Sequence, residues 1–546
     1  MKEKIIRKWI ARAPLFFLLW GFIAVRYCYY GFHYFPQLDD YIQYHNYAAY
    51  HPDLWGLIEQ LGLLAARPLA GLMDLFVWSP LFQEMIVGVW LIALLHAASA
   101  MLFRRVWARY FGTGTLFLVL YALLPLGMEG TYWMSASTRV VCSLFFVSLS
   151  MACFQYWCQQ GRKRWLVAYV IAQLLSYGFY EQGLVLGITG VCLVALLELR
   201  RGQKRAWWGA CTFLNVAIYG GFTRIFSQSA LYGGRTVLML PGEEGYWSVF
   251  VPRVLEQFRL AFWDGFWATL VTGTRRGLAF LASDGNWLYL AVVAVLCCGL
   301  IWASRLTERG RRHPLTALLV GGLMALAPVT PFLVLANPWF SLRGTVPSFC
   351  GLALMVDTLW GIVAARLPKG QWVEQGTAAV LAGVFCVASV SELHDYRATW
   401  HADQQVVRTI CMELNNGRGY EKQQRVGVLG MEDTFLPEQN FYYHEHIHGV
   451  TESWWALTGA CACVSGNGDF PEVVPLPEAE VLYSYEQEQY RLSGLEELYL
   501  YQAGRLIPLT MEPVGEETYR LLWPDGTLYA ETWEQDGVGY MQLAEN

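Results

Sequence analysis

The sequence predicts a mainly α-helical, polytopic membrane protein that ends in a small α+β domain. Hydrophobic residues make up 55% of its 546 residues and charged residues only 15%, whereas about a quarter of a typical soluble protein is charged. The mean hydropathy is +0.31. This composition excludes a disordered chain, a collagen, a coiled coil and a nucleic-acid-binding protein.

The charged residues divide the chain into two regions suited to different solvents. From Glu392 to Asn546 there are 26 Asp and Glu against 8 Lys and Arg, and the first 391 residues hold the other 18 acidic and 31 basic residues. An acidic balance of this size indicates a water-exposed domain. We therefore expect a transmembrane domain at 1–391 and an acidic extracytoplasmic α+β domain at 392–546.

The apolar segments of the first region predict the membrane spans. A bilayer core of roughly 30 Å requires about 20 apolar residues in a helix. We expect about eleven spans, with ten or twelve as alternatives because 165–199 also fits a bent hairpin. The expected spans are 13–32, 81–103, 114–131, 138–158, 165–180, 183–199, 206–226, 286–304, 314–336, 345–365 and 374–391.

Lys and Arg in the short connections predict the orientation, because basic loops stay on the cytoplasmic side. The N-terminus is basic, and basic groups follow every even-numbered span. These groups are Lys2, Lys4, Arg7, Lys8 and Arg12; Arg104, Arg105 and Arg109; Arg162, Lys163 and Arg164; Arg200, Arg201, Lys204 and Arg205; Arg305, Arg309, Arg311 and Arg312; and Arg366 and Lys369. The pattern predicts a cytoplasmic N-terminus, a first span retained as an anchor and an extracytoplasmic C-terminal domain.

Two outer loops, 33–80 and 227–285, are the expected places for a functional site. In the second loop, aromatic residues recur at helical spacing within 254–269. The stripe consists of Phe258, Phe262, Trp263 and Phe266. It favours a helix that lies in the membrane interface, with a ligand-binding role as the alternative.

The acidic domain opens with a helical pattern at 403–414. Strand patterns then follow at 425–430, 480–485, 497–501, 505–510, 519–523 and 527–532. Pro524-Asp525-Gly526, between the last two, predicts a hairpin turn. The domain is therefore expected to be small and mostly β.

Three other features of the acidic domain each allow two interpretations. The run His444-Glu445-His446-Ile447-His448 would place three imidazoles on one face of a strand, where they could bind a transition metal, or it is a polar strand. The pair Trp454-Trp455 could stack on a sugar ring or pack the domain against the membrane part. Cys411 could form a disulfide with Cys461 or Cys463.

The adjacent carboxylates Asp39 and Asp40 follow the first span and are the strongest single indication of chemistry. One could accept a proton from a hydroxyl group, and the other could orient that hydroxyl or help to hold a divalent cation such as Mg²⁺ or Mn²⁺. The alternative is a pair of solvated acids or an N-cap for the helix that follows.

Ionisable residues are also expected at the outer ends of the spans. They are Arg67, Glu129, Arg139, Glu181, Arg224 and Arg343. Charge within a membrane is costly and normally faces a cavity or a partner, and the arginine fork matches the geometry of a phosphate. The group indicates an anionic ligand. The alternative is that Arg139 and Arg343 reach the interface or pair with Glu129 or Glu181.

Four short motifs carry a resemblance that covers the membrane region. They are Leu38-Asp39-Asp40-Tyr41, Ala66-Arg67-Pro68-Leu69, Glu129-Gly130-Thr131-Tyr132-Trp133-Met134-Ser135 and Tyr180-Glu181-Gln182. With these motifs behind a first-span anchor, the chain resembles the GT-C superfamily of membrane glycosyltransferases. Within that superfamily it is most similar to the multi-spanning bacterial proteins described as GtrII-like and DUF6056-like.

The resemblance implies an enzyme of the bacterial cytoplasmic membrane that transfers a monosaccharide from a polyprenyl-phosphate donor to a cell-envelope glycan. Asp39 or Asp40 would be the base of a single inverting displacement, and Arg67, Arg139 and Arg343 would offset the charge of the leaving phosphate. The substrate pocket would contain Tyr41, Glu129, Tyr132, Trp133, Tyr180 and Glu181. No cofactor is implied with certainty, and a divalent cation stays open. The lipid bilayer is the other expected partner, and nucleic acid is not expected.

Two other functions fit a membrane protein of this kind. A polysaccharide polymerase or ligase would use a similar donor, but such enzymes rely chiefly on a large outer loop between late spans. A lipid or glycan transporter would show paired halves and charges near the bilayer midplane. In this sequence the paired acids follow the first span, and no repeat is evident.

Overall fold

The computed structural model describes residues 13–226, 237–305, 313–414, 424–434, 448–485 and 487–544. Within this part of the chain there are two compact units. The first unit contains the residues up to Tyr34 and Asp53–Leu393, and the second unit contains Phe35–Pro52 and the described residues from His394 onwards. We expected the whole of 33–80 in an outer loop of the membrane domain, whereas Phe35–Pro52 belongs to the second unit.

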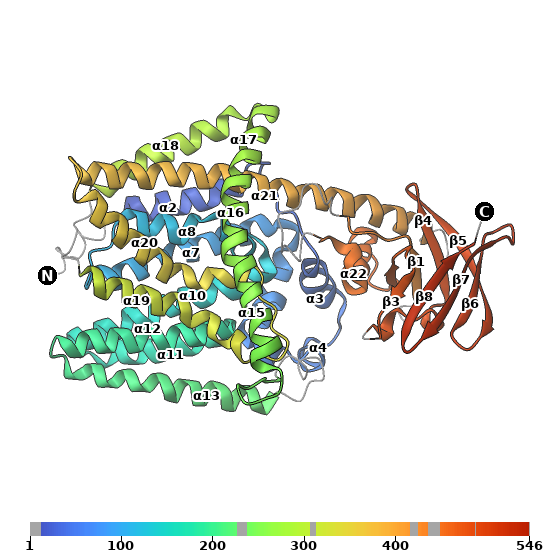
Figure 1. Ribbon diagram of the computed structural model, residues 1–546, viewed down its shortest axis with the longest axis horizontal. Coiled ribbons are helices and arrows are strands. Elements are labelled where there is room, and N and C mark those ends of the chain that lie inside the picture. Colours follow the sequence, from blue (N-terminus) through green and yellow to red (C-terminus); the bar gives the residue numbers. More distant parts are fainter. Residues whose placement is uncertain are drawn as a thin grey trace. The chain divides into compact units, whose positions relative to one another are not determined.

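The first unit is built from helices (Figure 1). Its longer helices are α2 (Ala13–Arg26), α7 (Met85–Ala108), α10 (Met134–Gln160), α11 (Lys163–Phe179), α12 (Glu181–Arg200), α13 (Cys211–Phe226), α17 (Gly273–Asp284), α18 (Trp287–Ser304), α19 (Pro314–Leu326), α20 (Phe349–Ala364) and α21 (Gly370–Leu414). Short helical turns connect them, namely α4 (Leu54–Gln60), α5 (Leu63–Ala66), α6 (Pro68–Met73), η2 (Asp74–Trp78), η3 (Ser79–Glu84), α8 (Thr115–Leu123), η4 (Pro125–Gly127), α9 (Glu129–Tyr132), η5 (Lys204–Ala210), η7 (Tyr246–Phe250), α15 (Val251–Phe258), η8 (Arg259–Asp264), α16 (Gly265–Trp267), η9 (Ala268–Thr272), η10 (Ala327–Leu333) and η11 (Leu342–Ser348). The last part of α21 belongs to the second unit.

Seven helical segments of the described chain are long and apolar enough to cross a membrane. They are Pro68–Ala108, Met134–Gln160, Glu181–Arg200, Trp287–Ser304, Pro314–Leu333, Leu342–Ala364 and Gly370–Leu414. The other four expected segments also contain helices, namely α2, α8, α11 and α13, but each of these has fewer than 18 residues. The mainly helical architecture with several helices long enough to cross a membrane is therefore confirmed, and the expected count of about eleven spans is not.

Small residues allow the central helix α10 to pack closely against α11 and α12. A Cβ on Gly183 of α12 would lie 1.8 Å from Oγ of Ser143 of α10, so a larger residue here would displace the Ser143 hydroxyl. Ser143 also shares a hydrogen bond of 3.0 Å with the hydroxyl of Ser176 on α11. Close backbone approach and hydroxyl bonds of this type hold helices together where the surroundings are apolar.

The predicted aromatic stripe lies on a helical stretch that includes α15, α16 and α17, which Figure 1 shows crossing the direction of the other helices. Two of its rings face the protein, because Phe258 and Phe262 contact the ring of Phe340 with centroids 4.8 and 5.6 Å apart. Trp263 is exposed. The stripe is therefore helical as expected, and part of it serves internal packing.

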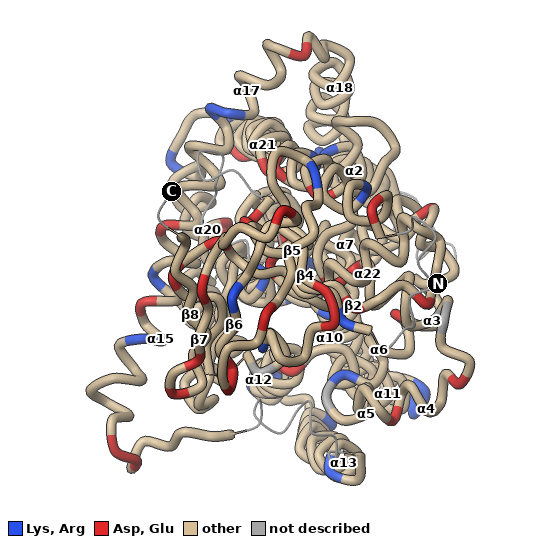
Figure 2. Tube along the Cα trace, turned by 90° about the vertical axis from the view of Figure 1, so that its right-hand side faces the viewer, with Lys and Arg blue, Asp and Glu red and all other residues tan. Residues whose placement is uncertain are grey.

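The second unit contains one sheet of eight strands in the order β2-β1-β4-β5-β6-β7-β8-β3. The strands are β1 (Arg425–Leu429), β2 (Glu472–Leu476), β3 (Val481–Tyr483), β4 (Glu497–Gln502), β5 (Arg505–Gly515), β6 (Thr518–Leu522), β7 (Leu528–Gln535) and β8 (Val538–Leu543). Strand β1 is parallel to β2 and β4, with Val426 opposite Val473 and Glu497, and every other pairing is antiparallel. Acidic residues recur along these strands (Figure 2).

Local sequence signals predicted most of this sheet. The turn at Pro524-Asp525-Gly526 forms as expected: Gly526 has φ +84°, and Asp525 Oδ1 accepts hydrogen bonds from the backbone N and Oγ1 of Thr527. Strands β2 and β8 and the helix α22 (Trp454–Ser465) were not predicted. Helix α22 packs against β2 and against η1 (Tyr41–Asn46). Helix η1 lies in Phe35–Pro52, which we call the first-loop segment.

Candidate functional site

Arg67 lies between two short helices, and the proline that follows it explains why the first helix ends there. Proline disfavours the α conformation of the residue before it and is well suited to the first position of a helix. Accordingly α5 ends at Ala66, Arg67 has φ −138° and ψ 64°, and α6 begins at Pro68. The side chain of Arg67 therefore leaves the chain at a fixed corner.

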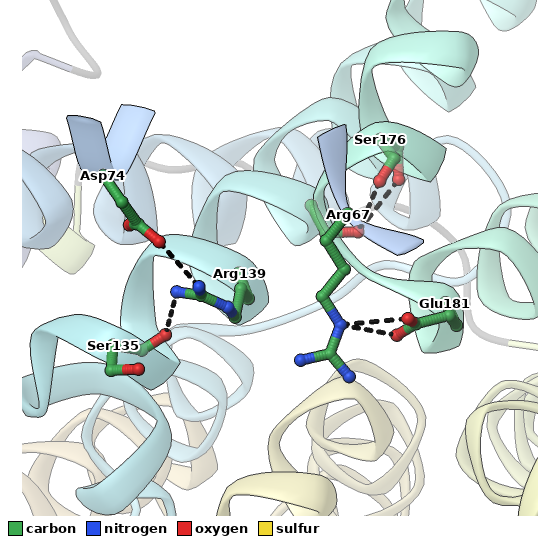
Figure 3. Close-up of polar contacts among 7 residues, drawn as sticks. Arg67, Asp74, Ser135, Arg139, Ser176 and Glu181 are labelled. Carbon is green, nitrogen blue, oxygen red and sulfur yellow. Dashed lines mark hydrogen bonds and ion pairs between the residues drawn. The ribbon is translucent and has the colours of Figure 1, made fainter. Parts of the chain in front are cut away.

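The guanidinium of Arg67 is anchored at one end only. Its Nε donates to both carboxylate oxygens of Glu181, at 2.9 and 3.0 Å, and its Cζ lies 4.8 Å from the centre of the Tyr180 ring. The two terminal amino groups point away from Glu181 (Figure 3), and within the described chain they have no hydrogen-bond partner. The side chain is 37% exposed, so these groups can reach a ligand.

Helix packing places Tyr180 and Glu181 beside this corner. Tyr180 is the extended residue between α11 and α12, with φ −158° and ψ 136°. Gly178, two residues earlier, lets α11 approach α6, since a Cβ there would lie 2.8 Å from Leu69. Glu181 begins α12, where a negative side chain is favoured by the partial positive charge of the helix N-terminus.

Arg139 forms a more deeply buried ion pair that the sequence did not predict. Its Nη2 lies 2.6 Å from Oδ2 of Asp74 at the start of η2, and its Nη1 donates to the carbonyl oxygen of Ser135 (Figure 3). The side chains are only 14% and 7% exposed. The sequence offered Glu129 or Glu181 as the alternative partner of Arg139, whereas this buried ion pair is with Asp74.

Arg343 and Glu129 pair as the alternative interpretation suggested. The Nη1 of Arg343 lies 3.8 Å from Oε1 of Glu129, and its backbone N donates to Oε2 at 3.0 Å. Ser341 Oγ donates to Oε1 at 3.2 Å, and the guanidinium of Arg343 lies over the Trp133 ring at 5.3 Å. Gly130 allows this approach, because a Cβ there would lie 3.2 Å from Cα of Arg343.

These three ion pairs form one cluster at one end of the helices. Tyr180 lies within electrostatic range of Arg67, Arg343, Glu129 and Glu181, and the charges of Arg67 and Arg139 repel each other. We call the set the arginine cluster, and it consists of Arg67, Arg139, Arg343, Asp74, Glu129, Glu181, Tyr180 and Trp133. The amide of Gln182 steadies it by donating to the carbonyl oxygens of Pro328 and Gly344, both at 3.0 Å.

One expected pocket residue has different surroundings. Tyr132 is fully buried, and its ring lies 5.1 Å from that of Tyr27 and 5.3 Å from that of Tyr34. Asp74 and Ser341, which sequence reasoning missed, contact members of the arginine cluster, and Gln182, which supports the cluster, was named only as part of the motif Tyr180-Glu181-Gln182. The only sequence signal for Asp74 is a lone acid before an apolar run, and no local pattern predicts Ser341.

The predicted catalytic acids, Asp39 and Asp40, belong to the second unit. Asp40 is fully buried, and its Oδ2 accepts a hydrogen bond of 2.9 Å from the backbone N of Gln37, whose carbonyl oxygen accepts from the N of Asp40. Asp39 is partly exposed, and its Oδ1 accepts a hydrogen bond of 3.2 Å from the indole Nε1 of Trp455. The adjacent carboxylates therefore have different surroundings.

Residues that are distant in sequence bind the first-loop segment within the second unit. The side-chain amide of Gln37 donates to the carbonyl oxygen of Tyr396 at 3.0 Å, and that of Gln404 donates to the Tyr41 hydroxyl at 3.3 Å. Gly459 of α22 approaches the backbone of Ile42 so closely that a Cβ would lie 3.1 Å from its N. Tyr41 itself is buried.

The expected metal and disulfide features have the following outcomes. The described residues contain no group of three or more His, Cys, Asp or Glu that could hold a metal ion. Of the predicted histidine run, 444–447 lie outside the described residues, and Nδ1 of His448 lies 3.1 Å from Oδ2 of Asp433.

All 13 cysteines are described and free, so Cys411 forms no disulfide, and its thiol donates to the carbonyl oxygen of Cys461.

The two units thus carry different chemistry. The arginine cluster presents an anchored guanidinium that suits an anion, and the second unit presents a carboxylate beside an exposed indole. Comparison with protein-family models gave no match for the chain, and comparison with curated proteins gave none either.

Proposed function

We propose that this protein is an integral-membrane glycosyltransferase of the GT-C type. It transfers a monosaccharide from a polyprenyl-phosphate donor to a cell-envelope glycan or related acceptor, with inversion at the anomeric carbon. One observation carries the proposal: Arg67 is fixed through its Nε to Glu181 and keeps both terminal amino groups available, beside two further arginines.

The donor phosphate is the ligand that suits this arrangement. A guanidinium offers two parallel N–H groups to two oxygens of a phosphate, and such bidentate, charge-assisted bonds are among the strongest in proteins. Anchoring by Glu181 lowers the cost of ordering the side chain when the ligand binds. Donors placed in advance where negative charge develops on the leaving phosphate lower the barrier to transfer.

The proposed reaction is a single displacement. A carboxylate, which we assign to Asp39, takes the proton of the acceptor hydroxyl as its oxygen attacks the anomeric carbon. The bond between that carbon and the phosphate oxygen breaks, and polyprenyl phosphate leaves with the bonding electron pair.

The membrane location also follows from the donor. A polyprenyl chain stays in the bilayer, and the seven apolar helices provide a membrane part long enough to meet it there. In this proposal the arginine cluster lies at the outer face of the bacterial cytoplasmic membrane and the N-terminus is cytoplasmic, as the distribution of Lys and Arg predicts.

Arg67 variants in proteoliposomes test the proposal. Purified protein would receive a panel of radiolabelled polyprenyl-phosphate monosaccharides and envelope glycans as acceptors. We expect the wild type to transfer sugar, Arg67→Ala to lose about 10²–10³-fold in turnover, and Arg67→Lys to recover only part of it, since lysine keeps the charge but not the fork.

Arg109 provides a matched control. Its Nε lies 2.7 Å from Glu198, which sits on the same helix as Glu181 but about 25 Å farther along it. Arg109→Ala should remove an arginine–glutamate pair of similar length, although with a buried carboxylate, while leaving transfer by the folded protein within about threefold of wild type. Equal losses in Arg67→Ala and Arg109→Ala would contradict a phosphate-binding role for Arg67.

A further inference from the structure

We propose that Asp39 and Trp455 together form the subsite that binds the acceptor sugar, with a neutral pyranose as the ligand. This inference rests on the proposed function, because it assigns an acceptor to the same reaction. It gives the second unit a direct role in recognising the acceptor sugar. It also assigns different roles to the adjacent acids, with Asp39 contacting the sugar and Asp40 holding the segment in place.

The first observation is the exposure of Trp455. The side chain before it, Trp454, packs against the hydrophobic core of the sheet, and its backbone N donates to the hydroxyl of Tyr490. Trp455 lies one residue later in the first turn of α22 and is 36% exposed, with the two ring planes 86° apart. One tryptophan therefore anchors the helix, and the other presents its ring to the surroundings.

The second observation is the bond between that ring and Asp39. The indole Nε1 of Trp455 donates to Oδ1 of Asp39 at 3.2 Å across 416 residues of sequence. In the part of the chain that is described, Oδ2 of Asp39 has no hydrogen-bond partner. The bond thus fixes the carboxylate and leaves its second oxygen available beside an exposed aromatic face.

A pyranose matches these two groups. Its ring carries C–H bonds on one face, which pack on an indole, and hydroxyls around the rim, which donate to a carboxylate oxygen. Tryptophan is well suited to such a contact because it buries a large area and loses little conformational entropy. The same carboxylate oxygen would receive the proton of the attacking hydroxyl.

The surroundings of Asp39 keep this subsite in place. The Asp40 carboxylate accepts a hydrogen bond from the backbone N of Gln37, within the first-loop segment. The close approach of Gly459 to Ile42 fixes the segment against α22, the helix that carries Trp455. Asp40 is therefore a positioning residue in this inference, and Asp39 is the group that contacts the sugar.

Glycan binding by the full chain tests the inference without relying on transfer. Saturation-transfer NMR would measure binding of the methyl glycosides of glucose, galactose, mannose and N-acetylglucosamine to protein in nanodiscs, with no donor present. We expect at least one to bind, and Trp455→Ala to weaken that binding by roughly tenfold or more. Trp533 stacks on Tyr540 in the sheet, and Trp533→Ala, the control, should bind as the wild type does.

Transfer kinetics then separate stacking from positioning. Trp455→Phe keeps a ring but loses the N–H group that holds Asp39. It should leave the acceptor KM within about threefold of wild type and lower kcat by roughly tenfold, because misplaced catalytic groups act on the chemical step. The donor KM should not change in either Trp455 variant.

Two results would overturn the inference. One is binding by Trp455→Ala that equals the wild type, and the other is the failure of every glycoside to bind the wild-type protein. Both differ from failure of the proposed function, which would be an absence of transfer by wild-type protein that still binds a glycoside.

Discussion

Arg67 and Glu181, which are 114 residues apart in sequence, are joined through the Nε of the arginine and both oxygens of the carboxylate, at 2.9 and 3.0 Å. If the two terminal amino groups of Arg67 bonded Glu181, they could not bind a ligand at the same time. Because only the Nε bonds Glu181, the two terminal amino groups point away from the carboxylate (Figure 3). In the proposed function, the pair holds the guanidinium of Arg67 so that its two terminal amino groups can bind the donor phosphate.

A double-mutant cycle on this pair should show strong coupling in function and little change in stability. Glu181→Ala should raise the donor KM by roughly tenfold, and adding it to Arg67→Ala should cost almost nothing more, because residues that act as a unit are non-additive. Both side chains are more than a third exposed, so either change should lower the free energy of unfolding by less than about 1 kcal/mol. Additive effects on the donor KM would mean that Glu181 acts independently of Arg67.

The buried pair of Arg139 and Asp74 should behave in the opposite way. Asp74→Ala leaves the Arg139 charge buried without its carboxylate, and breaking a buried pair costs about 3–5 kcal/mol. Thermal unfolding in detergent would measure the loss. Arg520→Ala is the matched control, because its pair with Glu531 has side chains 51% and 53% exposed, and it should cost below about 1 kcal/mol. If both variants lose the same stability, the burial of the Asp74 pair does not determine its energetic role.

Gly459 should be intolerant of larger side chains because it contacts the first-loop segment. In Gly459→Val the added atoms would press on Tyr41 and Ile42, whose nearest atoms lie 3.3 and 3.1 Å from the position of a Cβ. Overpacking of this kind costs about 1–3 kcal/mol, and the shift of the segment should also lower transfer.

Gly376 of α21 is the control for that substitution. No atom lies within 4 Å of the position of its Cβ, so Gly376→Ala should keep wild-type transfer and raise helix stability by up to about 1 kcal/mol. Unfolding and transfer would be measured together for both variants. Wild-type transfer in Gly459→Val would show that the position of the segment is not required for the reaction.

Local signals explain which parts of the fold could be predicted from the sequence. The helices of the first unit follow from apolar runs, and the hairpin at 524–526 follows from its turn residues. Strand β2 was missed because Pro475 argues against a strand, yet β2 is at an edge of the sheet, where proline is tolerated. Helix α22 was missed because its sequence has no polar face to reveal a helical period.

For the candidate site, the sequence predicted some of the charged residues but not all of their contacts. Residue type and place along the chain were enough to select Arg67, Arg139 and Arg343, since each lies at an end of an apolar segment. Glu129 was among the partners offered for Arg343, but the partner of Arg139 could not be read from the sequence, because Asp74 meets Arg139 only through helix packing. The placement of Phe35–Pro52 in the second unit depends on contacts made hundreds of residues later, such as that between Asp39 and Trp455.

The most direct test of the central claim is sugar transfer in proteoliposomes by wild type, Asp39→Asn and Asp40→Asn, with radiolabelled polyprenyl-phosphate donors and envelope glycans. The account predicts transfer by the wild type and a loss of at least about 100-fold in Asp39→Asn with an unchanged unfolding temperature, as expected for removal of a general base. Asp40→Asn should mainly lower the unfolding temperature, because Asp40 is buried and bonded within its segment. Transfer by Asp39→Asn at the wild-type rate, or movement of lipid or glycan across the bilayer without any transfer, would contradict the account.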